Sequence, residues 1–215
     1  MARRLRDAVL AAAALLILSP AMMAAVVGIR LSSIGPVLYR CRRMGRGGVE
    51  FWLYKFRTMH VERNRGGSAI TARDDRRIFR FGRWLRRTKI DELPQLFNVL
   101  RGEMAIVGPR PEDPDIVRRY YTAAQWSTLT VLPGLASPGS IYNYTHGEKL
   151  LREGDAERVY VTELLPVKLA LDMAYIRDAS LAYDVRVACR AIAVIMGTLA
   201  GQRSFPLPPE MRNSS

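Results

Sequence analysis

The first thirty residues constrain the fold more than any other part of the chain. They read MARRLRDAVLAAAALLILSPAMMAAVVGIR, and the 22 residues from Ala8 to Ile29 carry no charge. As a straight helix this run would be roughly 33 Å long, which is enough to cross the hydrocarbon core of a bilayer. The sequence therefore predicts a membrane-associated N-terminal segment.

The basic residues that flank this segment conflict with two interpretations of it, a cleaved signal peptide and a spanning helix. A cleaved signal peptide fits the basic start and the small residues at 21–25, but Arg30, Arg40 and Arg42 follow the apolar run. Positive charge at that position resists translocation. A spanning helix has basic residues on both sides, so the positive-inside rule gives it no orientation.

A third interpretation removes the conflict. Ser19-Pro20 lies at the middle of the apolar run. Proline deletes a backbone hydrogen bond and kinks a helix, and a serine hydroxyl can take up the freed carbonyl. A helix broken there can enter one leaflet and return to the same side, which keeps both basic flanks in the cytosol. We favour this re-entrant helix and place it at residues 1–30.

Positive charge is concentrated in the first part of the chain. The net charge is +13, and residues 1–90 hold 20 basic and 5 acidic side chains, against 13 basic and 15 acidic in residues 91–215. Such a block needs an anionic partner, which can be nucleic acid, anionic lipid or a phosphorylated substrate.

The segment 73–89 carries eight of these basic residues, interleaved with Phe79, Phe81 and Trp84. Arginine with aromatic residues is typical of nucleic-acid binding, but no recognition-helix, RNP-type or zinc-finger pattern is present. An amphipathic, arginine-rich segment also suits an anionic lipid surface. Because the apolar segment lies upstream, we favour lipid and expect no nucleic-acid partner.

Cysteine and histidine are too sparse to form a metal or disulfide framework. Cys41 and Cys189 lack a metal-binding spacing, and His60 and His146 stand alone. This argues against structural zinc and against disulfides, and it fits a reducing compartment.

Residues 37–59 predict two extended pieces around a glycine turn at 45–48. Lys55 and Arg57 lie at the end of the second piece, where a solvated basic edge is the simpler interpretation. The following stretch, residues 63–75, reads as a polar loop.

TKIDELPQ, residues 88–95, interrupts the basic run with two adjacent acids. Thr88 can cap a helix and Pro94 suits a first turn, so we expect Asp91 and Glu92 at or just before a helix N-terminus. The helix dipole and nearby basic residues should keep both carboxylates ionised. These basic residues are Arg86, Arg87 and Lys89. One acid could attack a substrate while the other holds a cation, although most such pairs are solvated caps.

GEMAIVGPRPE brackets Arg110 between Pro109 and Pro111. Two prolines hold the arginine in a stiff turn, which lowers the entropy lost when the guanidinium binds a phosphate. The alternative is an ordinary turn with an exposed arginine.

The last third predicts two helices. The first begins at Pro166, and in the second Val185, Ile192 and Leu199 follow helical spacing. The uncharged run 191–201 is too short to span a bilayer, so this second helix either packs in the core or lies in the plane of the interface. The tail at 203–215 looks loosely attached.

Taken together, four features resemble the bacterial sugar transferases, the monotopic phosphoglycosyl transferases. They are the apolar segment with Ser19-Pro20, YKFRTM (54–59), LRRTKIDELPQLFNVLRGEMAIVGPRPE (85–112) and VLPGL (131–135). The resemblance implies an enzyme at the cytoplasmic face of the bacterial inner membrane. Such an enzyme moves a phosphosugar from a UDP-sugar to polyprenol phosphate, giving a polyprenyl-diphosphate sugar and UMP. This step begins the assembly of an exopolysaccharide, capsule, O-antigen or glycoprotein glycan.

The resemblance also implies roles for individual residues. Asp91 would be the nucleophile of a covalent phosphosugar intermediate, and Glu92, with Asp91, would place Mg²⁺. Ser19-Pro20 matches the helix break of the family. The residues expected to bind the substrate phosphates are Lys55, Arg57, Arg86, Pro109 and Arg110.

The chain departs from the family pattern after VLPGL. Many members continue with a Trp-Gln-Val-Ser-Gly-like segment, but here residues 136–151 read ASPGSIYNYTHGEKLL. This segment is a candidate for sugar or nucleotide selection, and it leaves the sugar open.

We therefore expect a mainly helical α+β fold. It comprises a re-entrant helix at 1–30, a cytosolic catalytic domain with interfacial amphipathic helices at 31–202, and a flexible tail at 203–215. A catalytically inactive adaptor of a polysaccharide assembly complex is the alternative function.

Overall fold

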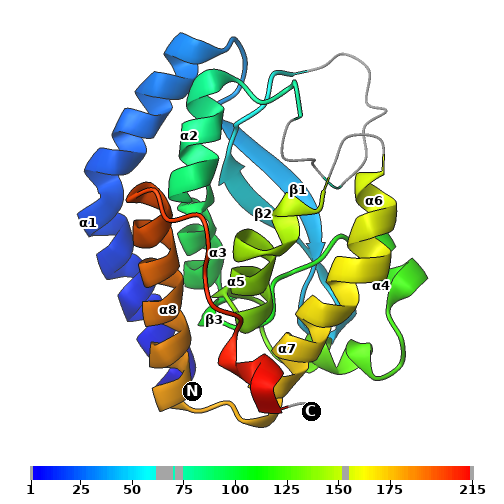
Figure 1. Ribbon diagram of the computed structural model, residues 1–215. Coiled ribbons are helices and arrows are strands. Elements are labelled where there is room, and N and C mark those ends of the chain that lie inside the picture. Colours follow the sequence, from blue (N-terminus) through cyan, green and yellow to red (C-terminus); the bar gives the residue numbers. More distant parts are fainter. Residues whose placement is uncertain (1, 62–69, 71–74, 152–154, 214–215) are drawn as a thin grey trace.

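The computed structural model describes residues 2–61, 70, 75–151 and 155–213, and it is mainly helical (Figure 1). Its helices are α1 (Ala2–Ser32), α2 (Arg80–Thr88), α3 (Gln95–Arg101), α4 (Pro114–Tyr120), α5 (Pro138–Thr145), α6 (Ala156–Val159), α7 (Leu165–Arg177) and α8 (Leu181–Leu199). Its strands are β1 (Leu38–Met44), β2 (Glu50–Phe56), β3 (Ala105–Val107) and β4 (Gly134–Ala136). The predicted mainly helical fold with a small β component is confirmed. The predicted polar loop at 63–75 lies largely outside the described residues.

Helix α1 contains the whole apolar N-terminal run and continues through Ser19 and Pro20 without interruption. Pro20 has no N–H to donate to the carbonyl of Leu16, and the Ser19 hydroxyl donates to that carbonyl instead, at 2.8 Å. By length and composition α1 could cross a membrane. The structure does not show the predicted break, so the re-entrant path stays a prediction.

Both ends of α1 are bonded to the rest of the protein. Near its start, Arg3 and Arg6 form ion pairs with the buried Asp184 of α8, at 3.1 and 2.8 Å. Just beyond its end, the guanidinium of Arg57 donates to the Ser33 hydroxyl at 2.8 Å and to the Ser33 carbonyl at 2.7 Å. The helix therefore lies along the body of the molecule (Figure 1).

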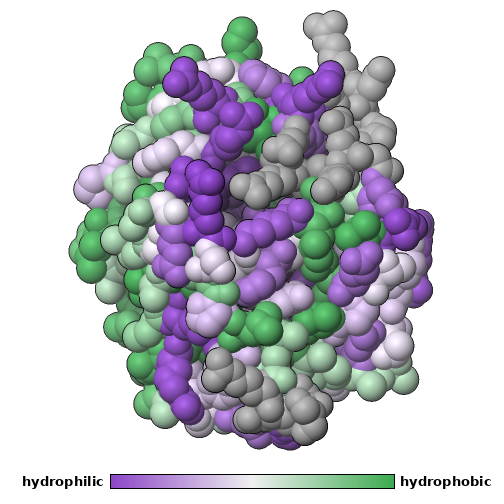
Figure 2. Space-filling model, in the orientation of Figure 1, coloured by the Kyte–Doolittle hydropathy of each residue, from purple (hydrophilic) through white to green (hydrophobic). Residues whose placement is uncertain are grey.

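One face of α1 packs and the other is exposed. Ala11, Ala25 and Ile29 are buried, and the small alanines allow α2 and α3 to approach closely. The exposed large apolar residues are Leu5, Val9, Leu10, Leu16, Ile17, Met23, Val27 and Leu31. Hydrophobic side chains accordingly line the edge of the molecule that α1 occupies (Figure 2).

Strands β1 and β2 form the predicted hairpin, with Leu38 opposite Phe56 and Met44 opposite Glu50. Gly47 and Gly48 have φ of 70° and 76° in the connection, a conformation that glycine adopts without strain. The hairpin is fixed to α3 through the buried Asn98. Its side chain donates to the Trp52 carbonyl at 2.7 Å and accepts from the Tyr54 N–H at 3.2 Å. The glycine turn is therefore confirmed, and α3 lies against β2.

Strands β3 and β4 form a short parallel pair, with Ala105 opposite Gly134 and Val107 opposite Ala136. The two chains approach closely at Gly134, where an added Cβ would lie 2.1 Å from the backbone nitrogen of Gly108. This contact places the segment that begins at Pro109 directly beside the start of β4, where the Gly134 N–H donates to the Pro109 carbonyl at 2.9 Å.

The two predicted C-terminal helices are confirmed as α7, with Pro166 in its first turn, and α8. Helix α8 buries Val187 and Val194 in the core. Its exposed large apolar residues are Leu181, Val185, Ile192, Met196 and Leu199. Helix α8 thus packs in the core through one face and presents an apolar stripe on another, and its position at a membrane interface stays a prediction.

The tail differs from the prediction of a loosely attached segment. Glu210 forms an ion pair with Arg190 at 2.8 Å and accepts a hydrogen bond from the Tyr183 hydroxyl at 2.7 Å. Pro208 is buried. The described part of the tail therefore packs against α8, because a single acid within it meets a basic and a hydroxyl partner.

We predict that Gly134→Ala lowers the free energy of unfolding by about 3 kcal/mol, because the new methyl group would meet backbone that cannot rotate away. Gly47→Ala is the control. There an added Cβ meets nothing within 4 Å, so we expect only the roughly 1 kcal/mol of left-handed strain. Thermal unfolding in detergent measures both variants, and equal losses would contradict the close-packing argument.

Candidate active site

Asp91 and Glu92 lie in a single 3-10 turn, Ile90–Glu92, between α2 and α3. Helix α2 ends at Thr88, whose hydroxyl donates to the Trp84 and Leu85 carbonyls at 3.0 Å each. The prediction that Thr88 caps a following helix is therefore wrong, because Thr88 closes the preceding one. The two acids come just before α3, as predicted.

Asp91 is 6% exposed, and its Oδ1 is buried with no hydrogen-bond partner among the described residues. Burial, followed by the neighbouring Glu92 carboxylate, raises the pKa of Asp91 to about 6. Asp91 therefore binds a proton more readily than an ordinary aspartate, although it remains ionised at neutral pH as expected. The guanidinium of Arg87, another basic residue expected near the acids, donates to the Thr198 carbonyl in α8 at 2.9 Å.

Glu92 has the opposite electrostatic environment. Its Oε1 lies 2.8 Å from Arg110 Nη2, 3.7 Å from Lys89 Nζ and 3.8 Å from Lys55 Nζ. Burial alone would raise the pKa of Glu92, but these three cations hold it well below its ordinary value. The turn therefore carries two adjacent carboxylates with very different proton affinities.

Arg110 reaches this turn from the segment after β3. Besides Glu92, its guanidinium donates to Gln95 Oε1 and to the Leu135 carbonyl, both at 3.2 Å. Its side chain is 15% exposed, so the alternative of an exposed arginine in an ordinary turn is wrong. The flanking prolines fix the backbone from which the guanidinium enters the site.

The segment around Arg110 is held from behind by α7. Asp172 accepts hydrogen bonds from the backbone N–H of Arg110 at 3.4 Å and of Gly139 at 2.9 Å. One helical turn earlier, Lys168 forms a buried ion pair with Glu112 at 2.9 Å, and the Tyr160 hydroxyl also donates to Glu112. Helix α7 thus fixes the backbone on both sides of Pro111.

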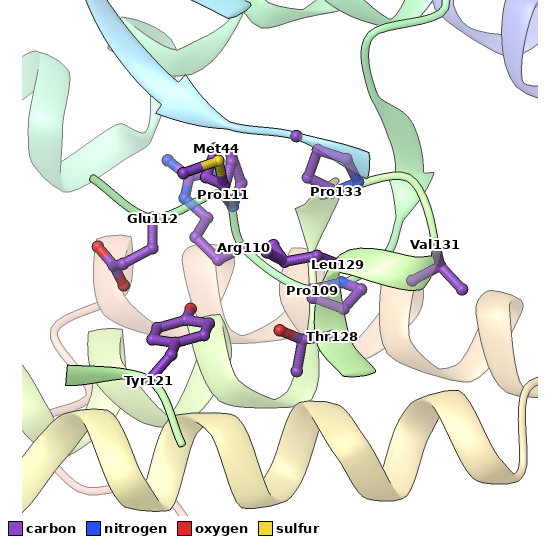
Figure 3. Close-up of a pocket in the computed structure, with 11 residues that line it drawn as sticks. Met44, Pro109, Arg110, Pro111, Glu112, Tyr121, Thr128, Leu129, Val131 and Pro133 are labelled. Carbon is purple, nitrogen blue, oxygen red and sulfur yellow. The ribbon is translucent and has the colours of Figure 1, made fainter. Parts of the chain in front are cut away.

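A small pocket borders the same segment (Figure 3). It is lined by Pro109, Arg110, Glu112, Tyr121 and Pro133, among others. Neither Asp91 nor Glu92 lines it, so we do not identify this pocket with the site of the chemistry.

Two polar residues beside the turn, one in α2 and one at the start of α3, have buried nitrogens without partners among the described residues. They are Nη1 of Arg86, a residue predicted from the sequence, and Nε2 of Gln95, which sequence reasoning missed. Gln95 is fully buried, and it follows Asp91 by four residues, the spacing of one helical turn. That spacing is the feature of the sequence from which Gln95 could have been predicted as a neighbour of Asp91.

Arg57 lies outside this cluster. It is 5% exposed and donates to Ser33 and to the Pro36 carbonyl, as described for the end of α1. Its predicted role in substrate binding is therefore replaced by a structural one. Lys55, which lies near the end of β2, does point toward Glu92: its Nζ is 3.8 Å from Glu92 Oε1.

The acid pair suits a magnesium ion. Mg²⁺ in phosphate chemistry is commonly held by one or two carboxylates together with substrate phosphates. Asp91 offers a buried unpartnered oxygen, and all the ion pairs of Glu92 use Oε1. The described residues contain no group of three or more candidate metal ligands, so an all-protein metal cage is not present within them.

Comparison with known proteins identifies the family of this chain. A family model described as bacterial sugar transferase matches residues 1–198. The UDP-glucose:undecaprenyl-phosphate glucose-1-phosphate transferases of Xanthomonas campestris pv. campestris and Caulobacter vibrioides are 37% and 35% identical over 200 and 201 residues. The alignments cover 92% and 91% of this chain, and 39% and 70% of the relatives.

A third relative carries a different sugar in its name. It is the UDP-N-acetylgalactosamine-undecaprenyl-phosphate N-acetylgalactosaminephosphotransferase of Aeromonas hydrophila, 33% identical over 196 residues. That alignment covers 90% of this chain and 43% of the relative, so the chain spans less than half the length of two of these three proteins. The chain belongs to the bacterial sugar transferase family, which confirms the resemblance found in the sequence.

We predict that Lys168→Met costs about 3 kcal/mol of folding free energy, because it leaves the buried Glu112 carboxylate without its cation. Adding Glu112→Gln to that variant should recover part of the loss, since the unpaired charge is then removed. Thermal unfolding of the two single variants and the double variant measures the coupling. Strictly additive losses would contradict a direct interaction between the two side chains.

Proposed function

We propose that this chain is a phosphoglycosyl transferase. It would move a sugar 1-phosphate from a UDP-sugar to undecaprenyl or another polyprenyl phosphate and release UMP. The observation that carries the proposal is the buried Asp91 carboxylate, with an unpartnered oxygen, beside the Glu92–Arg110 ion pair. The names of the family relatives support the donor and acceptor classes.

The reaction divides into two displacements at one phosphorus atom. In the first, an oxygen of Asp91 attacks the phosphorus that carries the sugar, the bond to the oxygen bridging the two phosphates breaks, and UMP leaves with that oxygen. The product is an acyl phosphate that links Asp91 to the sugar phosphate. In the second, a phosphate oxygen of the polyprenyl phosphate attacks the same phosphorus, and the carboxylate of Asp91 is regenerated.

The different environments of the two acids suit this division of labour. A carboxylate with a pKa of about 6 is ionised at neutral pH, yet its charge is only weakly stabilised, which favours attack. Glu92, surrounded by three cations, holds its charge and would not compete as a nucleophile. Arg110, Lys55 and Arg86, which lie around the two acids, would neutralise the negative charge of the diphosphate.

Mg²⁺ would be held by Glu92, with Asp91, together with the donor phosphates. When bound, it neutralises negative charge on the phosphates and so favours phosphoryl transfer. Glu92 would keep its position through the Arg110 ion pair, which also fixes the turn that carries Asp91.

The location of the site fits a lipid-linked acceptor. A polyprenyl phosphate keeps its head group at the membrane surface, so an enzyme that uses it must dock there. The apolar edge formed by α1 lies beside a band of hydrophilic side chains (Figure 2). This arrangement supports docking on anionic lipid at the cytoplasmic face of the bacterial inner membrane.

The contacts at both ends of α1 support the re-entrant or monotopic path over a spanning one. Asp184 binds the start of the helix and Arg57 holds its end, and both residues belong to the same domain. A helix that crossed the bilayer would have to place one of these ends on the opposite side. The same contacts argue against removal of the segment as a signal peptide.

We predict that the purified protein releases UMP from a UDP-sugar when Mg²⁺ and undecaprenyl phosphate are present. Asp91→Asn should lower that rate at least about 1,000-fold, because an amide cannot form the acyl phosphate. Separate assays for UMP and UDP across a panel of donors measure the reaction, and EDTA should stop it until Mg²⁺ is restored.

Asp115→Asn is the matched control, since Asp115 is an exposed acid on α4 and should leave the rate unchanged. Full activity of Asp91→Asn would contradict the nucleophile assignment. Release of UDP would indicate ordinary glycosyl transfer, and no product from any donor would favour the adaptor alternative.

We predict that both ends of α1 face the cytosol. Single cysteines at Ala2 and at Ile34, which is 98% exposed, should react with an impermeant maleimide in inverted vesicles and not in right-side-out ones. The background is Cys41→Ser with Cys189→Ser. A cysteine at Leu16, on the exposed apolar face, should be protected by lipid in both preparations. Labelling of the two ends from opposite sides would establish a spanning helix.

A further inference from the structure

Lys89 stands in an unusual backbone conformation immediately before the catalytic turn. Its φ is 59°, and it is the one non-glycine residue with a positive φ among the described residues. It follows the last residue of α2, a position where glycine is strongly favoured because other residues pay roughly 1 kcal/mol there. Because a lysine at this position costs stability, we expect its side chain to have a function that glycine could not supply.

The ammonium group of Lys89 lies at the edge of the acid pair. Its Nζ is 3.7 Å from Glu92 Oε1, 3.9 Å from Glu148 Oε1 and 4.2 Å from the centre of the Tyr144 ring. These contacts orient the ammonium electrostatically, but both carboxylate distances exceed that of a hydrogen bond. The side chain is 26% exposed, so its donors remain accessible.

The neighbouring groups also retain unused hydrogen-bonding capacity. Arg86 Nη1, Asp91 Oδ1 and Gln95 Nε2 are buried and without partners among the described residues. Buried polar atoms in folded proteins are nearly always paired, so three of them around one turn indicate that a polar ligand binds here. Two of the three are donors, as is Lys89, which favours an anionic ligand.

We propose that Lys89 is a further catalytic residue, whose ammonium binds an oxygen of a substrate phosphate. This inference rests on the proposed function and adds to it a residue on the side of the turn that faces Glu148. Lysine suits the role as a compact charge with three donors. Glu148 and Tyr144 orient the ammonium beside the site but leave its hydrogen-bond donors without an acceptor at hydrogen-bond distance. The phosphate belongs either to the UDP-sugar or to the polyprenyl phosphate.

Lys89→Gly separates this role from a structural one, because glycine removes the ammonium and also relieves the backbone. We expect the variant to be at least as stable as the wild type in thermal unfolding, and to raise the KM for one phosphate substrate at least about 10-fold, or about 1.4 kcal/mol. Lys89→Arg should retain most of the affinity. Unchanged KM values for both substrates in Lys89→Gly would overturn the proposal.

The two sources of the phosphate are distinguished by half-reactions. The UMP burst at varied UDP-sugar concentration, without acceptor, reports the donor alone, and steady-state rates at varied undecaprenyl phosphate report the acceptor. Calorimetry with UMP as the probe should show weaker binding to Lys89→Gly if the donor phosphate is the one contacted.

Arg177→Gln is the matched control, because it removes an exposed cation of α7 that takes no part in the proposed site. Its KM values should equal those of the wild type. An increase equal to that of Lys89→Gly would overturn the proposal by showing that loss of a positive charge anywhere on the protein has the same effect. Absence of UMP release from the wild type would contradict the proposed function instead, and UMP calorimetry would then still decide whether Lys89 binds a nucleotide phosphate.

Discussion

The ion pair between Arg110 and Glu92 is the interaction on which the site depends. At 2.8 Å it joins the turn before α3 to the segment after β3, and the same guanidinium reaches the Leu135 carbonyl in the middle of β4. The backbone of Arg110 is held in turn by Asp172 of α7. Without this cation, two adjacent buried carboxylates would repel each other and both would tend to bind protons. The pair therefore sets the geometry of the turn and also separates the proton affinities of Asp91 and Glu92.

The basic residues among the first 90 fall into two groups in the structure, those in ion pairs within the protein and those exposed on its surface. Some arginines are used internally, as when Arg3 and Arg6 meet Asp184 and Arg43 meets Asp113 at 3.0 Å. These pairs connect early residues to acids that come much later in the chain. The remaining exposed arginines include Arg30, Arg40, Arg76, Arg80 and Arg83. A composition count alone attributes all the charge to an external partner, whereas the fold uses part of it for its own cohesion.

Local signals in the sequence predicted local structure well. The glycine turn predicted the hairpin, the spacing of apolar residues predicted α8, and the adjacent acids were placed just before a helix. The errors concern properties that depend on distant partners. Nothing near Arg57 in the sequence indicates that Ser33 and Pro36 occupy its donors. The sequence also does not show that the pKa of Asp91 is raised, because the burial that raises it exists only in the assembled turns. Thr88 was misplaced because a threonine can bond to the helix before it as readily as it caps the next one.

The attachment of α1 follows from the same long-range pairing. A 31-residue helix is about 46 Å long, which exceeds the roughly 30 Å core of a bilayer, so length alone permits spanning. Crossing would nevertheless pull one end away from its partners and leave either Asp184 or Arg57 buried without them. A buried charge that loses its partner costs on the order of 3–5 kcal/mol. The exposed apolar face of the helix needs lipid, while its two ends need the domain. A path that enters and leaves the same leaflet satisfies both requirements, and Pro20, near the middle of the helix, is the residue at which such a path can bend.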